Sequence, residues 1–295
     1  MTATAPKLAS RPTYPRPPRE RRGGRRTPNV LGALGGFAWL LVIIVPVYYI
    51  VITSFRPQAG FFSDNQLLPS SEPTLEAYLL VLQSDFLLYL ANSIIVTTVA
   101  VAVTVTVSLM AAFVIVRSTH WTAKVSFSLL LMGLAIPLQA TIVPLFYMLS
   151  QAGLYDTLAA VILPSVGFAI PITVLILVNF LRDIPTELFD SMRVDGATQW
   201  RTLWSLVAPL ARPALVTVAI YDSLTVWNAF LFPLVLTQSP ENRVLPLSLW
   251  TFQGEFNVNV PGIMAAVVLS TLPILALYIF GRRQLVSGMT AGFGK

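Results

Sequence analysis

The 295-residue sequence contains no cysteine, a single histidine and few charged residues, which make up 11% of the chain. Without cysteine, disulfide frameworks and thiolate metal sites are excluded, and the sequence gives no sign of its redox compartment. Apolar residues make up 55% and come in long runs, without the spacing of a half-buried helix or strand. This composition lies outside the range of ordinary soluble domains, so we predict a protein that resides in a lipid membrane.

Six apolar stretches are long enough to cross the membrane as helices, which takes about 20 residues for about 30 Å of hydrocarbon. The stretches run from Val30 to Thr53, Leu87 to Val116, Val125 to Leu149, Leu158 to Leu181, Leu203 to Leu236 and Val260 to Phe280. Only helices or closed barrels satisfy the backbone in lipid, and these runs do not alternate as barrel strands do. We therefore predict an all-α, polytopic membrane protein with six transmembrane helices. The first run is too long for a secretory signal and is expected to remain as an anchor.

The basic residues predict the orientation. With the N-terminus in the cytosol, 17 of the 19 lysines and arginines lie on the cytosolic side, and only Arg56 and Arg243 lie outside. This bias predicts that both termini are cytosolic. Residues 1–29 hold eight of the basic residues, are rich in proline and have almost no large apolar side chains, which predicts a disordered cytosolic tail before a six-span domain at 30–295. Because orientation alone explains this basic tail, we expect no nucleic-acid partner.

Prolines recur inside the predicted spans, where each removes one backbone donor and tends to kink its helix. They are Pro137, Pro144, Pro164, Pro171, Pro213 and Pro273. One interpretation is ordinary packing of membrane helices, in which neighbours satisfy the freed groups. The other is that the kinks let the spans splay and close around a pathway.

The segment between the fourth and fifth spans, about 183–200, predicts a short amphipathic helix from Glu187 to Val194. At 100° per residue, Leu188, Phe189 and Met192 fall on one stripe. Gly196 suits the turn that ends this helix, and Thr198 can cap the next one. From these residues alone, the helix is either a docking element for a partner or a helix lying on the lipid surface.

This segment resembles a known family. The family's cytoplasmic loop reads Glu-Ala-Ala, three residues, then Gly, and about a dozen residues later Leu or Ile, two further residues and then Pro. The sequence matches it at Asp195-Gly196-Ala197 and Leu206-Val-Ala-Pro209, with Ile184-Pro185 and Glu187-Leu188 upstream. The chain thus resembles the permease subunits of binding-protein-dependent ATP-binding-cassette importers, close to the second permease of the maltose-type carbohydrate group. It departs at the triplet, which is Asp190-Ser191-Met192.

Further motifs carry the same resemblance along most of the chain beyond the tail. They are Thr53-Ser54-Phe55-Arg56-Pro57, Asn92-Ser93, Gly153-Leu154-Tyr155-Asp156-Thr157, Trp227-Asn228, Phe232-Pro233-Leu234 and Gly288-Met-Thr-Ala-Gly292. Each motif is weak by itself. Their order along the chain and their side of the membrane make the set specific.

The resemblance implies a multi-pass permease subunit of the plasma membrane that imports sugars or short oligosaccharides by alternating access. The implied partners are a second permease, a cytosolic ATPase dimer and an extracytoplasmic solute-binding protein. The ATPase-coupling residues would be Glu187, Leu188, Asp190, Ser191, Met192, Asp195, Gly196, Ala197 and Pro209, with C-terminal ATPase contacts at Gly292, Gly294 and Lys295.

The chain itself is not expected to be an enzyme. A phosphate loop needs Gly-x-x-x-x-Gly-Lys-Ser/Thr, and at the nearest match, Gly294-Lys295, the first required glycine is Met289. We therefore expect no cofactor in this chain, with Mg-ATP bound by the partner ATPase, and no metal site.

Asp222 is the one acidic residue inside a predicted span, where a carboxylate costs about 2.5–3.5 kcal/mol on insertion scales. One interpretation is that Asp222, Trp227 and Asn228 line a polar substrate pathway. The other is that Asp222 pairs within the bundle while Trp227 packs or marks the outer interface. An autonomous ion-coupled transporter is the alternative function, but it would need more intramembrane charges than Asp222 and Arg212.

Two segments outside the membrane, Ser54 to Asp85 and Thr237 to Asn259, are long enough to meet a binding protein. The second carries the aromatic residues Trp250, Phe252 and Phe256. These aromatic side chains are either contacts for the binding protein or anchors at the membrane interface.

Overall fold

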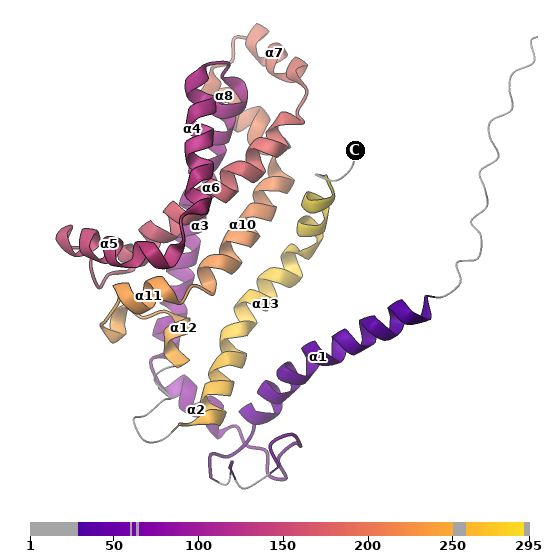
Figure 1. The fold of residues 1–295 in the computed structure, drawn as a ribbon, viewed down its shortest axis with the longest axis vertical. Coiled ribbons are helices and arrows are strands. Elements are labelled where there is room, and N and C mark those ends of the chain that lie inside the picture. Colours follow the sequence, from indigo (N-terminus) through magenta and orange to yellow (C-terminus); the bar gives the residue numbers. More distant parts are fainter. Residues whose placement is uncertain (1–28, 60, 63–64, 250–257, 292–295) are drawn as a thin grey trace, which may run out of the picture. The chain divides into compact units, whose positions relative to one another are not determined.

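The computed structural model describes residues 29–59, 61–62, 65–249 and 258–291, and its regular elements over these ranges are helices (Figure 1). By its internal contacts the chain divides into residues 1–46 and 47–295. The boundary falls inside helix α1, Val30–Ser54, next to Pro46. Asn29 caps the start of α1, because its side-chain oxygen accepts the N–H of Gly32 at 2.9 Å.

The second unit is built around long apolar helices. Helices α3 (Phe86–Arg117) and α6 (Leu158–Arg182) pack along each other, and α10 (Arg212–Trp227) packs against both of them and against α13 (Val260–Ala291). Among the described residues, four helices are long and apolar enough to cross a membrane, or six if two bent pairs each count as one span. The prediction of an all-α, polytopic membrane fold is confirmed.

The third predicted span is bent by 103°. It consists of α4 (Trp121–Met132), the one-turn helix η1 (Gly133–Ala135) and α5 (Leu138–Gln151). The break falls at Pro137, which has no N–H to continue the helical hydrogen bonds. Not every proline acts in this way, since Pro164 and Pro171 lie inside the unbroken helix α6.

The fifth predicted span is divided further. It begins with α8 (Gln199–Thr202), a π-helical turn η2 (Leu203–Val207) and α9 (Ala208–Leu210), and this part meets α10 at 78°. Pro213 stands in the first turn of α10, where proline is tolerated at a helix start. After α10 the chain is irregular through Phe230 and then forms the six-residue helix α11 (Leu231–Leu236).

The core of this unit lies at two levels. Near one end, Leu109, Leu177, Val207 and Val218 are buried between α3, α6, η2 and α10. Near the other end, Tyr89, Trp227 and Leu245 are buried with the short helices α2 (Glu76–Gln83) and α12 (Leu245–Ser248). Figure 1 shows α7 (Thr186–Val194) and α8 at the first end and α2 at the opposite end.

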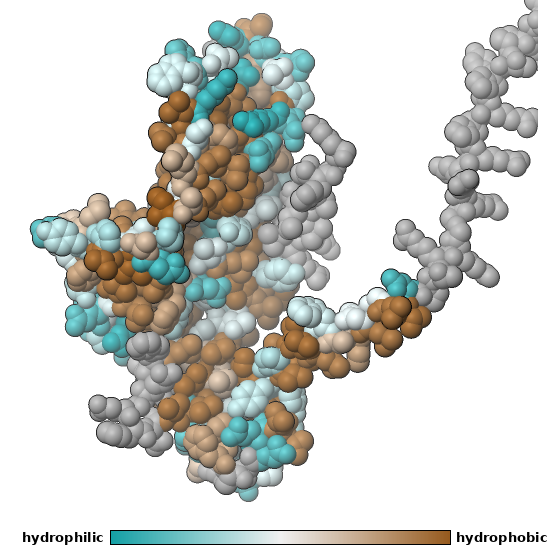
Figure 2. Space-filling view, viewed as in Figure 1, coloured by the Kyte–Doolittle hydropathy of each residue, from teal (hydrophilic) through white to brown (hydrophobic). Residues whose placement is uncertain are grey.

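The exposed side chains are apolar along the long helices and polar at the end that carries α7 and α8. Ile94, Ile95, Val99 and Val103 on α3 are exposed although they are apolar, as expected for a helix that faces lipid or another membrane subunit. Figure 2 shows apolar side chains over the long helices and polar ones gathered at the end that carries α7 and α8.

Candidate coupling segment and membrane cavity

Helix α7 spans Thr186–Val194, close to the predicted Glu187–Val194, and its end is set by backbone chemistry. The N–H of Ala197 bonds to the carbonyl of Met192 at 2.9 Å, and the N–H of Gly196 to that of Arg193 at 3.1 Å. These two bonds form a Schellman motif, which needs a left-handed residue just past the helix. Gly196 provides it with φ +72°. The prediction for Gly196 is thereby confirmed.

One face of α7 is anchored to the bundle through Phe189, which is 6% exposed and packs with Leu181 and Leu203. The guanidinium of Arg117, at the end of α3, lies 4.4 Å from the centre of the Phe189 ring, within the range of a cation–π contact. The predicted stripe is therefore divided: Phe189 points into the chain's own core, whereas Leu188 is 39% exposed and Met192 is partly exposed.

The remaining predicted coupling residues lie around this anchor. The exposed ones are Glu187, Asp190, Ser191, Asp195 and Gly196, and Ala197 is half-buried. Thr198 caps α8, because its Oγ1 accepts the N–H of Arg201 at 3.2 Å. Pro209 lies in α9, directly before the 78° bend. Helix α7 and the turn after it thus present a surface of mostly polar side chains with a few exposed apolar ones among them. This surface is joined to α10 through α8, η2 and α9.

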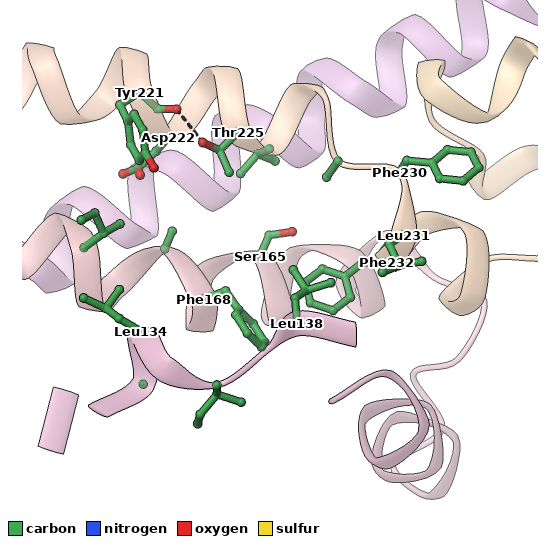
Figure 3. A pocket seen from close by; sticks show the side chains of 16 residues that line it. Leu134, Leu138, Ser165, Phe168, Tyr221, Asp222, Thr225, Phe230, Leu231 and Phe232 are labelled. Atoms are coloured by element: carbon green, nitrogen blue, oxygen red, sulfur yellow. Dashed lines mark hydrogen bonds between the residues drawn. The ribbon is translucent and has the colours of Figure 1, made fainter. Parts of the chain in front are cut away.

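A cavity of about 410 Å³ lies between the bent third span, α6 and the fifth span (Figure 3). Its walls are mostly apolar and aromatic, with a few hydroxyl groups and one carboxyl group. The lining residues labelled in Figure 3 are Leu134, Leu138, Ser165, Phe168, Tyr221, Asp222, Thr225, Phe230, Leu231 and Phe232. An apolar cavity with a few polar groups is the usual form of a small-molecule site.

Asp222 lies at one wall of this cavity and is 1% exposed. Its carboxylate accepts a hydrogen bond from the hydroxyl of Thr173 on α6, at 2.9 Å to one oxygen and 3.2 Å to the other. Thr173 is also fully buried. The pair therefore joins α6 to α10 at the level of the cavity, and the hydroxyl offsets part of the cost of burying the carboxyl group.

Trp227 and Asn228 do not share this cavity. They line a separate depression of about 190 Å³ with Leu245 and Ser270. The indole N–H of Trp227 donates to the carbonyl of Ser270 at 3.3 Å, and the Asn228 amide donates to the carbonyl of Leu224 at 2.8 Å. The three residues predicted to line one pathway are thus divided between two sites, because Trp227 and Asn228 lie about 140° and about 240° around α10 from Asp222.

Several predicted contact residues lie outside the described residues. They are Trp250, Phe252 and Phe256 in the segment predicted to lie outside the membrane, and Gly292, Gly294 and Lys295 at the C-terminus. Within the described residues, no group of three His, Cys, Asp or Glu side chains lies close enough to hold a metal ion.

Residues 104–290 match the family of binding-protein-dependent transport system inner membrane components. A putative ABC transporter permease protein of Caldicellulosiruptor sp. is 39% identical over 254 residues, which cover 86% of this chain and 92% of the relative. The chain belongs to this family. It is a multi-pass permease of the cell membrane.

The permease also has relatives whose names state a cargo. The diacetylchitobiose uptake system permease protein of Streptomyces coelicolor is 29% identical and covers 91% of this permease and 96% of its own length. The trehalose/maltose transport system permease protein of Thermococcus litoralis is 29% identical, with coverages of 90% and 96%. A bacterial ABC transporter that imports the acidic polysaccharide alginate has the same fold, with a TM-score of 0.75 at 21% identity over 86% of the permease and 95% of that chain.

From the sequence, Asp156 stood out only as part of a motif, and its hydrogen bonds were not predicted. Asp156, between α5 and α6, binds the segment after α11: its carboxylate accepts the backbone N–H groups of Gln238 at 2.8 Å and Ser239 at 3.0 Å, and the hydroxyl of Ser239. The hydrogen bonds from Ser239 and Gln238 lower the pKa of Asp156 below its usual 3.8. These partners lie 82 and 83 residues away in the sequence, so no local pattern could reveal them.

The N-terminal part of α3 holds the same segment. The Asn92 amide donates to the carbonyls of Glu241 at 2.7 Å and Arg243 at 2.9 Å, and Ser93 accepts the N–H of Leu245 at 2.8 Å. The motif Asn92-Ser93 therefore serves to fasten the chain between α11 and α12.

Proposed function

We propose that the permease is the transmembrane subunit of an ATP-driven importer of sugars or short oligosaccharides. A separate cytosolic ATPase supplies the energy, and the cavity opens alternately to the two sides of the membrane. Family membership supports the transport class, and relatives whose names state diacetylchitobiose or trehalose and maltose support the cargo class. The cytosolic position of both termini is part of this proposal and rests on the distribution of basic residues.

The observation that carries the proposal is the form of α7. A helix that lay on the lipid surface would turn its apolar side chains to one side. In α7, Phe189 instead points into the bundle while Leu188 and Val194 stay exposed beside Glu187 and Asp190. This arrangement suits a helix that is fixed to the spans on one face and is gripped by a partner on the other.

The path by which movement of α7 reaches the cavity is short. Phe189 packs with Leu203 of η2, and η2 continues through α9 into α10, which carries Asp222 and Tyr221 at the cavity. A rigid displacement of α7 by the ATPase would therefore tilt α10 at the 78° bend and change the shape of the cavity.

The cavity suits part of a sugar ligand. Its aromatic rings, including Phe168 and the 46% exposed ring of Tyr221, can stack on the apolar face of a sugar. The hydroxyls of Ser165 and Thr225 donate to carbonyls of their own helices, and their oxygens, like the carboxyl group of Asp222, can accept hydrogen bonds from sugar hydroxyls. A second permease would complete the pathway, and an extracytoplasmic binding protein would deliver the cargo to the outer side.

Crosslinking from α7 tests the proposal. The chain has no cysteine, so Leu188→Cys and Met192→Cys each give a unique attachment point for a benzophenone maleimide. We expect light-induced crosslinks to an ATPase subunit in membranes that hold the complete importer. Thr122→Cys, in an exposed first turn of α4, is the matched control and should crosslink much less. Crosslinks from both α7 positions to lipid alone would refute the coupling role.

A further inference from the structure

Helix α11 forms one end of the cavity but has little stability of its own. Phe230, Leu231 and Phe232 line the cavity there (Figure 3). The helix is only six residues long and is separated from α10 by the irregular stretch that follows Trp227. A helix of this length does not persist by itself, because helix formation needs a costly nucleus. Its position is therefore set by contacts with other elements.

Part of this support is apolar. Phe232 and Leu236 are buried against Leu149 of α5 and Ala160 of α6, and the rings of Phe232 and Phe168 are 5.5 Å apart. These contacts hold one side of α11. They leave its C-terminal carbonyl groups and the chain beyond it to be fixed by hydrogen bonds.

The hydrogen bonds come from Asp156. Its N–H donates to the carbonyl of Leu236, the last residue of α11, at 3.0 Å, and its own carbonyl accepts from the Asn242 amide at 2.7 Å. Its carboxylate also accepts from Gln238 and from both donors of Ser239. We call Asp156 with these four partners the Asp156 latch. Bonds to an ionised carboxylate are stronger than those between neutral groups.

The loop that carries Asp156 is itself held in place. Asp156 has φ +58° and Gly153 has φ +69°, both in the left-handed region, which aspartate tolerates better than most residues. The next residue, Thr157, caps α6, because its hydroxyl accepts the N–H of Ala160 at 3.3 Å and donates to the carbonyl of Leu154 at 2.6 Å. The latch therefore ties α11 to the joint between α5 and α6, two helices that also line the cavity.

We propose that Asp156 is a positioning residue for transport, which holds α11 as the outer wall of the cavity while the cavity is closed to the outside. This inference rests on the proposed function, which defines the outer side and places the cavity on the pathway. Entry of cargo from outside then requires α11 either to leave the latch or to move together with the joint between α5 and α6.

Cysteine labelling in the complete importer, reconstituted or in intact cells, tests this inference. Leu231→Cys places a unique thiol at the cavity wall, and a membrane-impermeant methanethiosulfonate is added outside. We expect Asp156→Ala, which removes all three hydrogen bonds to the carboxylate, to raise the labelling rate at position 231 at least tenfold, because loss of one strong hydrogen bond alone shifts an opening equilibrium by about that factor. Asp156→Asn, which keeps an acceptor for the two backbone N–H groups, should restore most of the slow rate.

Two further variants keep the test independent of the folding of Asp156→Ala. Asn242→Ala and Ser239→Ala each remove one bond of the latch from its other side and should raise the rate in the same direction by a smaller factor. Asp85→Ala is the matched control, because Asp85 is also an acid in an outer segment but its side chain makes no capping bond to α3. It should leave the rate unchanged.

A reference thiol separates failure of the latch from failure of the proposed function. Glu241→Cys lies on the exposed part of the outer segment and should be labelled rapidly from outside in every background. If position 241 is not labelled, the assigned orientation is wrong and the proposed function falls with the latch. Suppose instead that position 241 is labelled, and that the labelling rate at position 231 is as slow in the Asp156, Ser239 and Asn242 variants as in the chain that keeps these three residues. The latch alone is then refuted.

Discussion

At the scale of single residues, Gly196 ends the proposed coupling helix α7 at φ +72°, and the space around it is open to a Cβ atom. Gly196→Ala therefore clashes with nothing and should cost about 1–2 kcal/mol through backbone strain alone. We expect reduced uptake at limiting substrate with normal amounts of protein in the membrane. Gly167→Ala is the control, since Gly167 has equal space within the helix α6 and no positive φ, and it should preserve both uptake and thermal stability. Equal uptake by the two variants would contradict the role given to this turn.

Thr173 is the hydrogen-bond partner of the buried Asp222 carboxyl group. Thr173→Val should destabilise the permease by about 1–3 kcal/mol, because it leaves a buried polar group without that donor. Thr97→Val makes the same chemical change on α3, at a buried hydroxyl with no hydrogen-bond partner, and should be nearly neutral. Thermal unfolding of the purified importer measures both effects. Thr173→Ser should recover most of the stability, and equal losses for both valine variants would contradict the pairing.

The lowered pKa of Asp156 gives the latch a defined pH dependence. The hydrogen bonds from Ser239 and Gln238 favour the ionised carboxyl group in the folded protein, so its stabilising effect is complete above the usual pKa of 3.8 and is lost as the pH falls through the lower folded value. We therefore expect the labelling rate at position 231, corrected for reagent reactivity, to stay constant between about pH 7 and pH 5. A rise with a midpoint near pH 6 would contradict this assignment.

At the scale of elements, two adjacent side chains of α7 distinguish its structural role from its proposed coupling role. Phe189→Ala should destabilise the permease by about 3 kcal/mol or more, because it leaves a cavity in the core and removes the ring under Arg117. Leu188→Ala, at an exposed position, should change the unfolding temperature little but reduce ATP-driven uptake. Unfolding curves and uptake measured on the same preparations distinguish the two. A loss of stability in both variants would mean that α7 is only a structural helix.

The elements also show how far the sequence can be interpreted. Lengths of apolar runs were sufficient for an all-α membrane fold, and Gly196 and Thr198 marked the turn and cap of the coupling segment. Apolar runs do not reveal a bend, however, and Pro137 stands at a 103° break while Pro164 lies in an unbroken helix. Tertiary neighbours decide between these outcomes, because they satisfy or fail to satisfy the freed backbone groups.

The candidate sites were also predictable only in part, because tertiary neighbours decide which side chains meet. The amphipathic stripe of α7 identified Leu188 and Phe189 together, but only packing against Leu203 shows which of them faces the bundle. Asp222 was recognisable as a costly intramembrane acid, whereas its partner Thr173 lies 49 residues away. The separation of Asn228 from Asp222 follows from the 100° helical period, which places them about 240° apart around α10, so the prediction of a shared pathway could have been corrected from the spacing.

At the scale of the whole molecule, the basic residues outside the N-terminal tail should be sufficient to orient the chain. Deleting residues 2–26 removes eight lysines and arginines, yet nine remain on the side assigned to the cytosol and two on the other. We expect the truncated chain to keep its orientation. The thiol of Thr122→Cys should then react only with membrane-permeant reagents, and that of Glu241→Cys with impermeant ones. Reversed accessibility would show that the tail determines the topology.

The π-helical turn η2 bears on the angle about the helix axis at which the candidate coupling segment stands relative to the elements that follow it. A π turn holds about one residue more than an α turn, and each residue of an α-helix corresponds to a rotation of about 100°. Removing one residue between Leu203 and Val207 would restore a regular helix, and because a π turn and an α turn each complete one full turn, the flanking segments would keep nearly the same angle about the helix axis. The π turn therefore takes up one surplus residue while the candidate coupling segment keeps its angular position about the helix axis.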